Sequence, residues 1–184
     1  MTRLVALFLC AATVWGAEWS APVEVHYDEK RCITYRAKWT GDALEVQATL
    51  DPGWHTFAMD NKERQREKLA GKPSLGIEKA TEIEVGGGLS ATGTWLQSPP
   101  KDFSKPELRY YSWGFDDQAV FAVKARPAGS RPARITVRGQ ACSDAICKNI
   151  DVSIQLPVTG AKRASTADRD LKALVPVRVI KSGV

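Results

Sequence analysis

Two strand-like runs are joined by the stretch Gly139-Gln140-Ala141-Cys142-Ser143-Asp144-Ala145-Ile146-Cys147-Lys148. Two cysteines with four residues between them follow a strand-like run, Ala133 to Arg138, and precede another, Ile150 to Leu156. The Ser, Asp and Ala between the cysteines favour a turn. A disulfide needs Cα atoms roughly 4.4–6.8 Å apart, which two strands joined by a tight turn can supply. The stretch therefore predicts a hairpin whose tip can carry a Cys142–Cys147 bridge near solvent.

Short runs that alternate apolar and polar residues dominate the rest of the chain. Such alternation is typical of strands with one buried face, and Gly, Pro and Asp punctuate the runs. Nine such runs, read as eight or so strands, predict an all-β sandwich. The runs are Val23–Tyr27, Ile33–Trp39, Leu44–Leu50, Trp54–Phe57, Thr81–Val85, Leu108–Trp113, Ala119–Val123, Arg134–Arg138 and Val152–Leu156.

Three segments depart from the strand pattern. Asn61 to Ala70 is charged and lacks β-branched residues, which predicts a short exposed helix, inserted between strands and ended by Gly71. Ser98 to Pro106 contains three prolines and one large apolar residue, Phe103. The prolines exclude a central strand, and Phe103 either packs on the edge of the sandwich or covers something. Val175 to Ile180 is short enough to pair with a sheet edge.

The two ends of the chain predict an exported protein with a basic tail. Arg3, the apolar run Leu4 to Val14 and the small residues up to Ala17 resemble a signal peptide over residues 1–17. The apolar run is too short to span a bilayer, so we expect a periplasmic or otherwise secreted protein that is not membrane-spanning. Residues 18–158 form the predicted domain, and residues 159–184 a basic, flexible tail.

The net charge of +5 is a property of the tail. Residues 17–158 hold 19 Lys/Arg and 19 Asp/Glu, whereas residues 159–184 hold six basic residues and two acidic ones. A folded body with no net charge gives little support to a nucleic-acid-binding face, so we expect no nucleic-acid partner.

The cysteines allow several readings. Cys10 would leave with the signal, and Cys32 has the context of a small, half-buried apolar residue. The pair Cys142 and Cys147 could be a structural staple, worth roughly 2 kcal/mol for so short a loop. Half of a zinc site would need two further ligands, and the sequence shows none at a recognisable spacing. A redox pair is the third reading, and spacing alone leaves staple and redox pair equally open.

If the two cysteines are a redox pair, charged residues beside them could tune thiolate formation. Arg138 and Lys148 flank the motif and could favour a thiolate, while Asp144 inside it would oppose one or handle a proton.

A family resemblance favours the redox reading. The segment Gly139 to Cys147, a strand leading into two cysteines and a second strand, resembles the cysteine hairpin of the N-terminal periplasmic domain of the thiol:disulfide interchange protein DsbD. Upstream, Pro52 to Phe57 resembles that family's turn and aromatic strand. Gly93-Thr94-Trp95, followed by a loop and Tyr110-Tyr111, resembles its middle section. Together the matches cover most of residues 20–158, and the cysteine hairpin is the specific one.

The resemblance implies an immunoglobulin-like β-sandwich with Cys142 and Cys147 as the catalytic pair. It implies a cap loop, with Phe103 as the cap residue, and active-site aromatics at His55 and Phe57; His55 could exchange protons with the sulfurs, or could be a solvated strand histidine. Cys147 is the favoured sulfur for the partner. The implied partners are thioredoxin-like periplasmic proteins or a membrane electron-donor protein, with no metal or other cofactor.

The sequence also departs from the family. Lys148-Asn149-Ile150 follows the second cysteine where prolines are common, and the cap loop is longer and richer in proline. The membrane conduit and thioredoxin-like domain are lacking, which predicts a stand-alone version. The expected function is thiol–disulfide exchange, with protein-disulfide reductase-type chemistry. The alternative is a non-catalytic secreted binding module in which Cys142–Cys147 only pins a hairpin.

Overall fold

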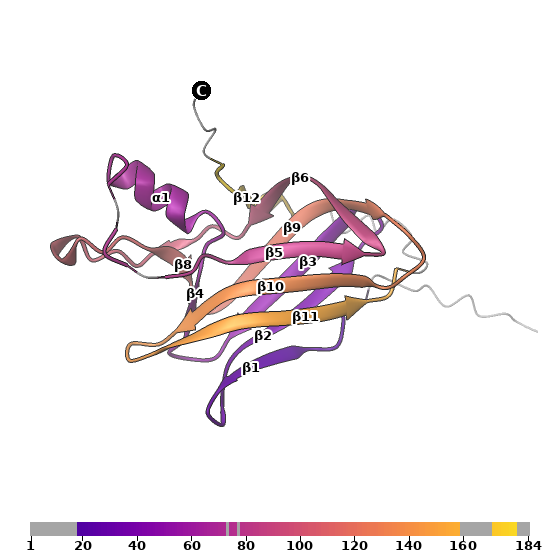
Figure 1. Cartoon of the computed structure of the whole chain (residues 1–184), viewed down its shortest axis with the longest axis horizontal. Coiled ribbons are helices and arrows are strands. Elements are labelled where there is room, and N and C mark those ends of the chain that lie inside the picture. Colours follow the sequence, from indigo (N-terminus) through magenta and orange to yellow (C-terminus); the bar gives the residue numbers. More distant parts are fainter. Residues whose placement is uncertain (1–17, 73, 77, 159–170, 180–184) are drawn as a thin grey trace, which may run out of the picture.

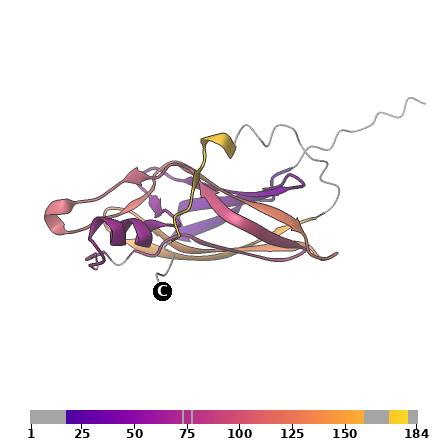
Figure 2. The ribbon, with the colours of Figure 1, turned by 90° about the horizontal axis from the view of Figure 1, so that it is seen from above.

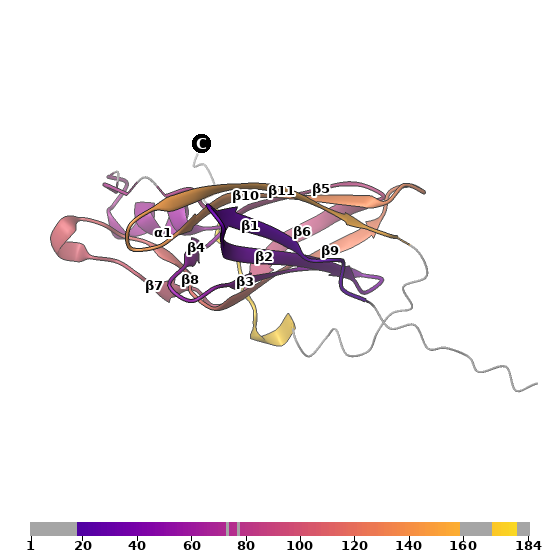
Figure 3. The same ribbon diagram turned by 90° about the horizontal axis from the view of Figure 1, so that it is seen from below.

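The computed structural model describes residues 18–72, 74–76, 78–158 and 171–179. Its strands form two antiparallel sheets that lie face to face (Figures 1 and 3). The first sheet has the order β1 (Val23–Tyr27), β2 (Lys30–Trp39), β3 (Ala43–Leu50), β9 (Gln118–Pro127), β6 (Leu89–Gln97) and β12 (Val175–Pro176). The second has the order β11 (Cys147–Leu156), β10 (Ala133–Cys142), β4 (His55–Phe57), β8 (Trp113–Phe115) and β7 (Lys101–Asp102), with β5 (Glu82–Gly87) also paired to β10.

The core lies between the two sheets and follows from the alternation of each strand. In β2, Ile33, Tyr35 and Ala37 point inward and are fully buried. In β10, Ile135 and Val137 do the same from the facing sheet. Burial of alternate residues on both inner faces is the arrangement that a sandwich requires. The expected all-β sandwich with a cysteine-bearing hairpin and a short helical insertion is confirmed.

The end of the sandwich that carries the cysteines also carries most of the irregular structure. The tip of the β10–β11 hairpin and the loop containing the 3₁₀ helix η1 (Pro106–Leu108) project from this end, and α1 (Asn61–Lys68) lies close by (Figures 1 and 2). The helix matches the predicted insertion, with Gly71 in a left-handed conformation (φ 84°) shortly after its end.

Two details of the expected strand pattern were wrong. Leu108 to Trp113 is not one strand, because Arg109 adopts a left-handed conformation (φ 52°) and Tyr110 folds back to pair with Lys105. The strand starts only at Trp113. The long strand β6 was missed because the residues in its middle, Ser90 to Thr94, are small and because its register shifts around Gly93, whose φ is 87°. Such a glycine bulge interrupts the alternation that identifies a strand.

The predicted tail is described only in part. Val175 and Pro176 pair with Gln97 and Leu96 of β6, so the expected pairing of this segment with a sheet edge is confirmed. A second 3₁₀ helix, η2, spans Leu171–Ala173. The predicted signal peptide, including Cys10, and residues 159–170 lie outside the described residues. Among the described helices, none is long and apolar enough to cross a membrane.

Candidate functional site

The disulfide closes the tip of the β10–β11 hairpin. The two strands pair in one continuous register that ends at Cys142 opposite Cys147. The two sulfurs are bonded at 2.08 Å, and the Cα atoms lie 4.0 Å apart, slightly closer than the usual range for disulfides. The Ser143 amide donates to the Ile146 carbonyl (2.8 Å), and the Ser143 hydroxyl accepts from the Ile146 amide (3.3 Å). The serine therefore closes the turn that brings the two cysteines together.

The two cysteines differ in their exposure to solvent. Cys142 is 3% exposed because its strand has neighbours on both sides, with β11 on one and His55 of β4 on the other. Cys147 begins β11, which is an edge strand, and is exposed. A molecule approaching from solvent therefore meets Cys147 first.

Aromatic side chains lie beside the buried half of the bridge. His55 is directly opposite Cys142 in the β4–β10 register. Its ring centroid is 5.3 Å from that of Phe57, in an edge-to-face arrangement, and 5.3 Å from that of Phe103. Phe57 is fully buried, whereas His55 and Phe103 are partly exposed. Contacts of this kind fix ring positions through packing and through the quadrupoles of the rings.

Phe103 is held over the site by the geometry of its loop. Its amide donates to the Ser112 carbonyl (2.9 Å), and the Lys105 amide donates to the Tyr110 carbonyl (2.8 Å). A Cβ built on Gly114 would lie 3.2 Å from Cε2 of the Phe103 ring, so the ring rests against β8. These hydrogen bonds join the two sides of the loop and hold Phe103 next to His55.

Burial and charge oppose each other at His55. Burial lowers the pKa of His55 below its ordinary value, and Lys105 lowers it further. The negative charges of Asp144, Asp116 and Glu78 act in the opposite direction but do not overcome burial. The imidazole is therefore neutral at pH 7 and has a nitrogen that can accept a proton.

All six predicted site residues line one pocket of about 800 Å³. The structure thus brings together Cys142, Cys147, Asp144, His55, Phe57 and Phe103. Arg138 and Lys148, which the sequence placed beside the cysteines, do not line it. Arg138 instead forms ion pairs with Glu84 (3.1 Å) and Asp151 (3.6 Å) on the outer face of the sheet.

Sequence reasoning named none of the other ten pocket residues as part of the site. Three of them adjoin predicted site residues in the quoted motifs, namely Gly53, Trp54 and Ser143. The other seven come from irregular segments without a periodic signal: Leu75, Gly76, Glu78, Lys105, Leu108, Tyr110 and Asp116. Two observations stand out among them. The carboxylate oxygens of Glu78 are shielded from solvent, and burial raises the pKa of Tyr110 to about 12.

Cys32 lies away from this pocket. It is fully buried in β2, and its thiol is 3.7 Å from the Lys30 carbonyl oxygen. Burial raises the pKa of this thiol. Within the described residues, no group of three or more His, Cys, Asp or Glu side chains is placed to hold a metal ion.

No family model and no curated protein matches the chain. One solved structure that it resembles is the reduced N-terminal domain of DsbD from Neisseria meningitidis, with a TM-score of 0.42 and 11% identity over 70% of this chain and 87% of that one. Another is the GAE domain of GGA2p from Saccharomyces cerevisiae, with a TM-score of 0.35 and 9% identity over 74% and 98%. Similarities this weak carry no argument about function.

Proposed function

We propose that the chain exchanges electrons with protein thiols through the Cys142–Cys147 disulfide. The observation that supports this most strongly is the position of the bridge. One cysteine is exposed at a sheet edge, the other is buried against a histidine, and both line a pocket large enough for part of another protein. A purely structural bridge needs neither the pocket nor this asymmetry.

The exchange proceeds in two displacements at sulfur. A partner's thiolate attacks the Cys147 sulfur, a new disulfide forms between them, and Cys142 leaves as a thiolate that takes up a proton. A second thiol of the partner then attacks the partner's sulfur in the mixed disulfide. This step releases Cys147 as a second thiol and leaves the partner oxidised. In the reverse direction the reduced pair delivers two electrons to a partner disulfide.

The neighbouring side chains suit these steps. Neutral His55 lies opposite Cys142 and can receive or return the proton of that thiol. Phe103 limits access to the bridge, and Phe57 supports the histidine ring from the interior. Asp144 lies in the turn between the cysteines, where its charge favours a protonated His55 and opposes a thiolate.

The setting of this reaction also belongs to the proposal. The signal-like residues 1–17 favour the periplasm or another compartment outside the cytoplasm, where disulfides persist. The hairpin sequence resembles that of the DsbD N-terminal domain, and from this we propose thioredoxin-like periplasmic proteins or a membrane electron-donor protein as partners.

A trapping experiment tests the reaction and its asymmetry. Cys142→Ser and Cys147→Ser variants, both in a Cys32→Ser background, are mixed with a thioredoxin-fold protein that has one active-site cysteine, activated with thionitrobenzoate. We expect the Cys142→Ser variant, which keeps the exposed Cys147, to form a mixed disulfide rapidly, and the Cys147→Ser variant to react slowly. The exchange function is refuted if neither folded variant forms the mixed disulfide faster than the same variant does in denaturant.

A further inference from the structure

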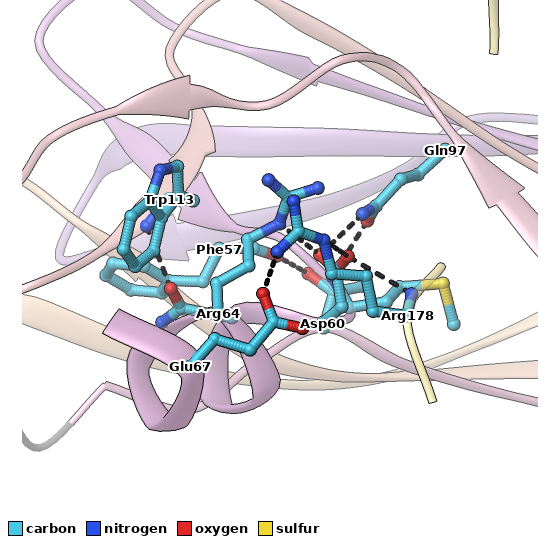
Figure 4. Close-up of polar contacts among 10 residues, drawn as sticks. Phe57, Asp60, Arg64, Glu67, Gln97, Trp113 and Arg178 are labelled. Carbon is cyan, nitrogen blue, oxygen red and sulfur yellow. Dashed lines mark hydrogen bonds and ion pairs between the residues drawn. The ribbon is translucent and has the colours of Figure 1, made fainter. Parts of the chain in front are cut away.

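Asp60 is a fully buried carboxylate between β4 and α1. Its Oδ1 accepts hydrogen bonds from Arg64 Nε at 2.8 Å and from Gln97 Nε2 at 2.6 Å (Figure 4). The Gln97 side chain is itself fixed, because its oxygen accepts from the Met59 amide at 2.9 Å. A buried charge of this kind is tolerated only where several partners satisfy it.

The C-terminal segment supplies the remaining partner. The Arg178 amide donates to Asp60 Oδ2 at 3.2 Å, and Arg178 Nε lies 3.9 Å from the same oxygen. The Arg178 guanidinium also pairs with Glu67 of α1 (Figure 4). Just before it, the Val177 amide donates to the Trp95 carbonyl at 2.9 Å, continuing the β12–β6 pairing. A segment 118 residues away in sequence thus completes the environment of Asp60.

The ionised state of Asp60 depends on these contacts. Burial alone would raise the pKa of Asp60, but the hydrogen bonds from Arg64, Gln97 and the Arg178 amide lower it below its ordinary value. Undocking the C-terminal segment would leave Oδ2 without the donor that Arg178 provides. The carboxylate would then gain by moving toward water, and the start of α1 would move with it.

The same helix holds residues 111–113, the returning side of the loop whose outgoing side, Pro99 to Pro106, is the predicted cap loop. The Trp113 amide donates to Asn61 Oδ1 at 2.8 Å, and Gln65 Nε2 donates to the Tyr111 carbonyl at 2.8 Å. Ser112, between them, accepts from the Phe103 amide at 2.9 Å. The first two turns of α1 therefore connect the Asp60 cluster on one side to the backbone that positions Phe103 on the other.

We propose that residues 171–179 form a brace: when docked on Asp60 they hold α1 and the cap loop closed over the disulfide, and when released they open it. The brace itself follows from the contacts above, whereas its consequence for thiol exchange rests on the proposed function. When two sites are coupled through such a two-state element, each typically changes the binding equilibrium of the other by the same factor, about 5–150-fold.

Amide hydrogen exchange of the full-length protein tests the brace. Arg178→Asp reverses the charge that faces Asp60 and Glu67. Lys172→Asp, on the exposed Lys172 of η2, makes the same charge change in the same segment without touching them. In Arg178→Asp we expect exchange to accelerate about tenfold at Val177 and also at Phe103 and Lys105, within the range for coupled sites. Lys172→Asp should match the parent at all three amides.

A second substitution at Arg178 distinguishes local release of the brace from general unfolding. Both variants keep the backbone donor to Asp60, but Arg178→Gln only removes the positive charge, whereas Arg178→Asp also adds a carboxylate that repels Asp60 and Glu67. Arg178→Gln should therefore change the same amides in the same order by a smaller factor. In both variants the core amides of β2 and β10 should stay protected. The brace is refuted if Val177 is released while Phe103 and Lys105 keep the parent rates, or if Val177 itself keeps the parent rate.

The effect on the disulfide is read separately. Reduction of the Cys142–Cys147 bridge by dithiothreitol should be faster in Arg178→Asp than in Lys172→Asp, because the cap loop opens more often. Equal rates would refute the control of access. Dithiothreitol reports access to the bridge without any protein partner. If the trapping experiment failed, the proposed function would be refuted, but the amide-exchange and dithiothreitol results would still test the brace.

Discussion

At the scale of single residues, His55 shows how the fold adjusts one side chain. Opposite Cys142 and beside two phenylalanine rings, it is only partly exposed to water. Because burial outweighs the nearby carboxylates, the pKa of His55 lies below its ordinary value. The neutral ring is then able to take a proton from a thiol, and this ability has a cost in stability when the solution becomes acidic.

That cost gives a pH prediction. In the unfolded chain the pKa of His55 returns to its ordinary value of 6.5, so between that pH and the lower pKa of the folded state the unfolded chain binds more protons. Stability contributed by the neutral histidine is therefore complete above about pH 6.5 and falls as pH decreases through the folded pKa. We expect the free energy of unfolding in urea to fall more between pH 7.5 and 5 in the parent than in His55→Phe.

The matched control is His26→Phe. It removes the only other histidine of the sequence, at an exposed position of β1 outside the pocket. The prediction is wrong if the free energy of unfolding falls equally in the parent and in His55→Phe between pH 7.5 and 5. In that case His55 would titrate in the folded protein as it does in the unfolded chain.

Two sources predicted the residues of the site. The hairpin pattern around the cysteines indicated Cys142, Cys147 and Asp144, whereas the family resemblance supplied His55, Phe57 and Phe103; all six share one pocket. Glu78 and Tyr110 reach the pocket from irregular loops, and no spacing indicated this. Arg178 meets Asp60 across 118 residues, which no local pattern records.

At the scale of elements, the proposal gives the cap loop control of access to the disulfide. Phe103 packs on His55 with ring centroids 5.3 Å apart, and a pair of this kind contributes about 0.5–1.5 kcal/mol. Phe103→Ala should lose about that much stability in urea unfolding. It should also speed reduction of the disulfide by dithiothreitol by up to about tenfold, the factor that corresponds to 1.4 kcal/mol.

Phe103→Leu is the comparison, because it keeps an apolar cover and should change the reduction rate less. Identical rates in the parent, Phe103→Leu and Phe103→Ala would contradict the role of Phe103 as a cap.

The strand pair β4–β8, on which the cap rests, allows a second test. A Cβ on Gly114 would lie 2.0 Å from the Thr56 carbonyl oxygen, and this backbone atom cannot turn aside as a flexible side chain could. Gly114→Ala should therefore lower the free energy of unfolding by about 1–3 kcal/mol, the usual cost of overpacking.

The control for this prediction is Gly86→Ala in β5. A Cβ there has nothing within 4 Å, and φ is outside the left-handed region, so we expect little change. Similar losses of stability in the two variants would show that the close approach of β4 and β8 is not what requires Gly114.

Most elements followed from alternation, and the failures have a common cause. β1, β2 and β3 were predicted nearly to their ends because one face of each is buried in the core. β6 and the cap loop were not, because a glycine bulge at Gly93 and a left-handed Arg109 break the period. Their conformations depend on tertiary contacts that a short window of sequence does not contain.

At the scale of the whole molecule, the core between the sheets carries the stability and the disulfide adds little. Large apolar side chains from both sheets are fully buried, among them Tyr35, Phe121 and Ile135. The two cysteines are five positions apart in the sequence. For so short a loop the chain-entropy model gives a stabilisation of roughly 2 kcal/mol. A sandwich with such a core does not require the bridge in order to fold.

The corresponding prediction concerns the protein without its bridge. Cys142→Ala/Cys147→Ala should keep the far-ultraviolet circular dichroism of the parent and lose roughly 2 kcal/mol in the free energy of unfolding. A variant that fails to fold would identify the bridge as a principal stabilising element and would favour the structural reading.

The reduction potential of the Cys142–Cys147 bridge tests the central claim most directly. It is measured by equilibrating the Cys32→Ser protein in thiol–disulfide buffers and counting reduced protein by alkylation and mass spectrometry. An exchange bridge at the mouth of a pocket should have a potential more positive than about −300 mV, where cellular thiol systems can reduce it. A potential clearly below about −300 mV would show a structural staple and would contradict the proposed function.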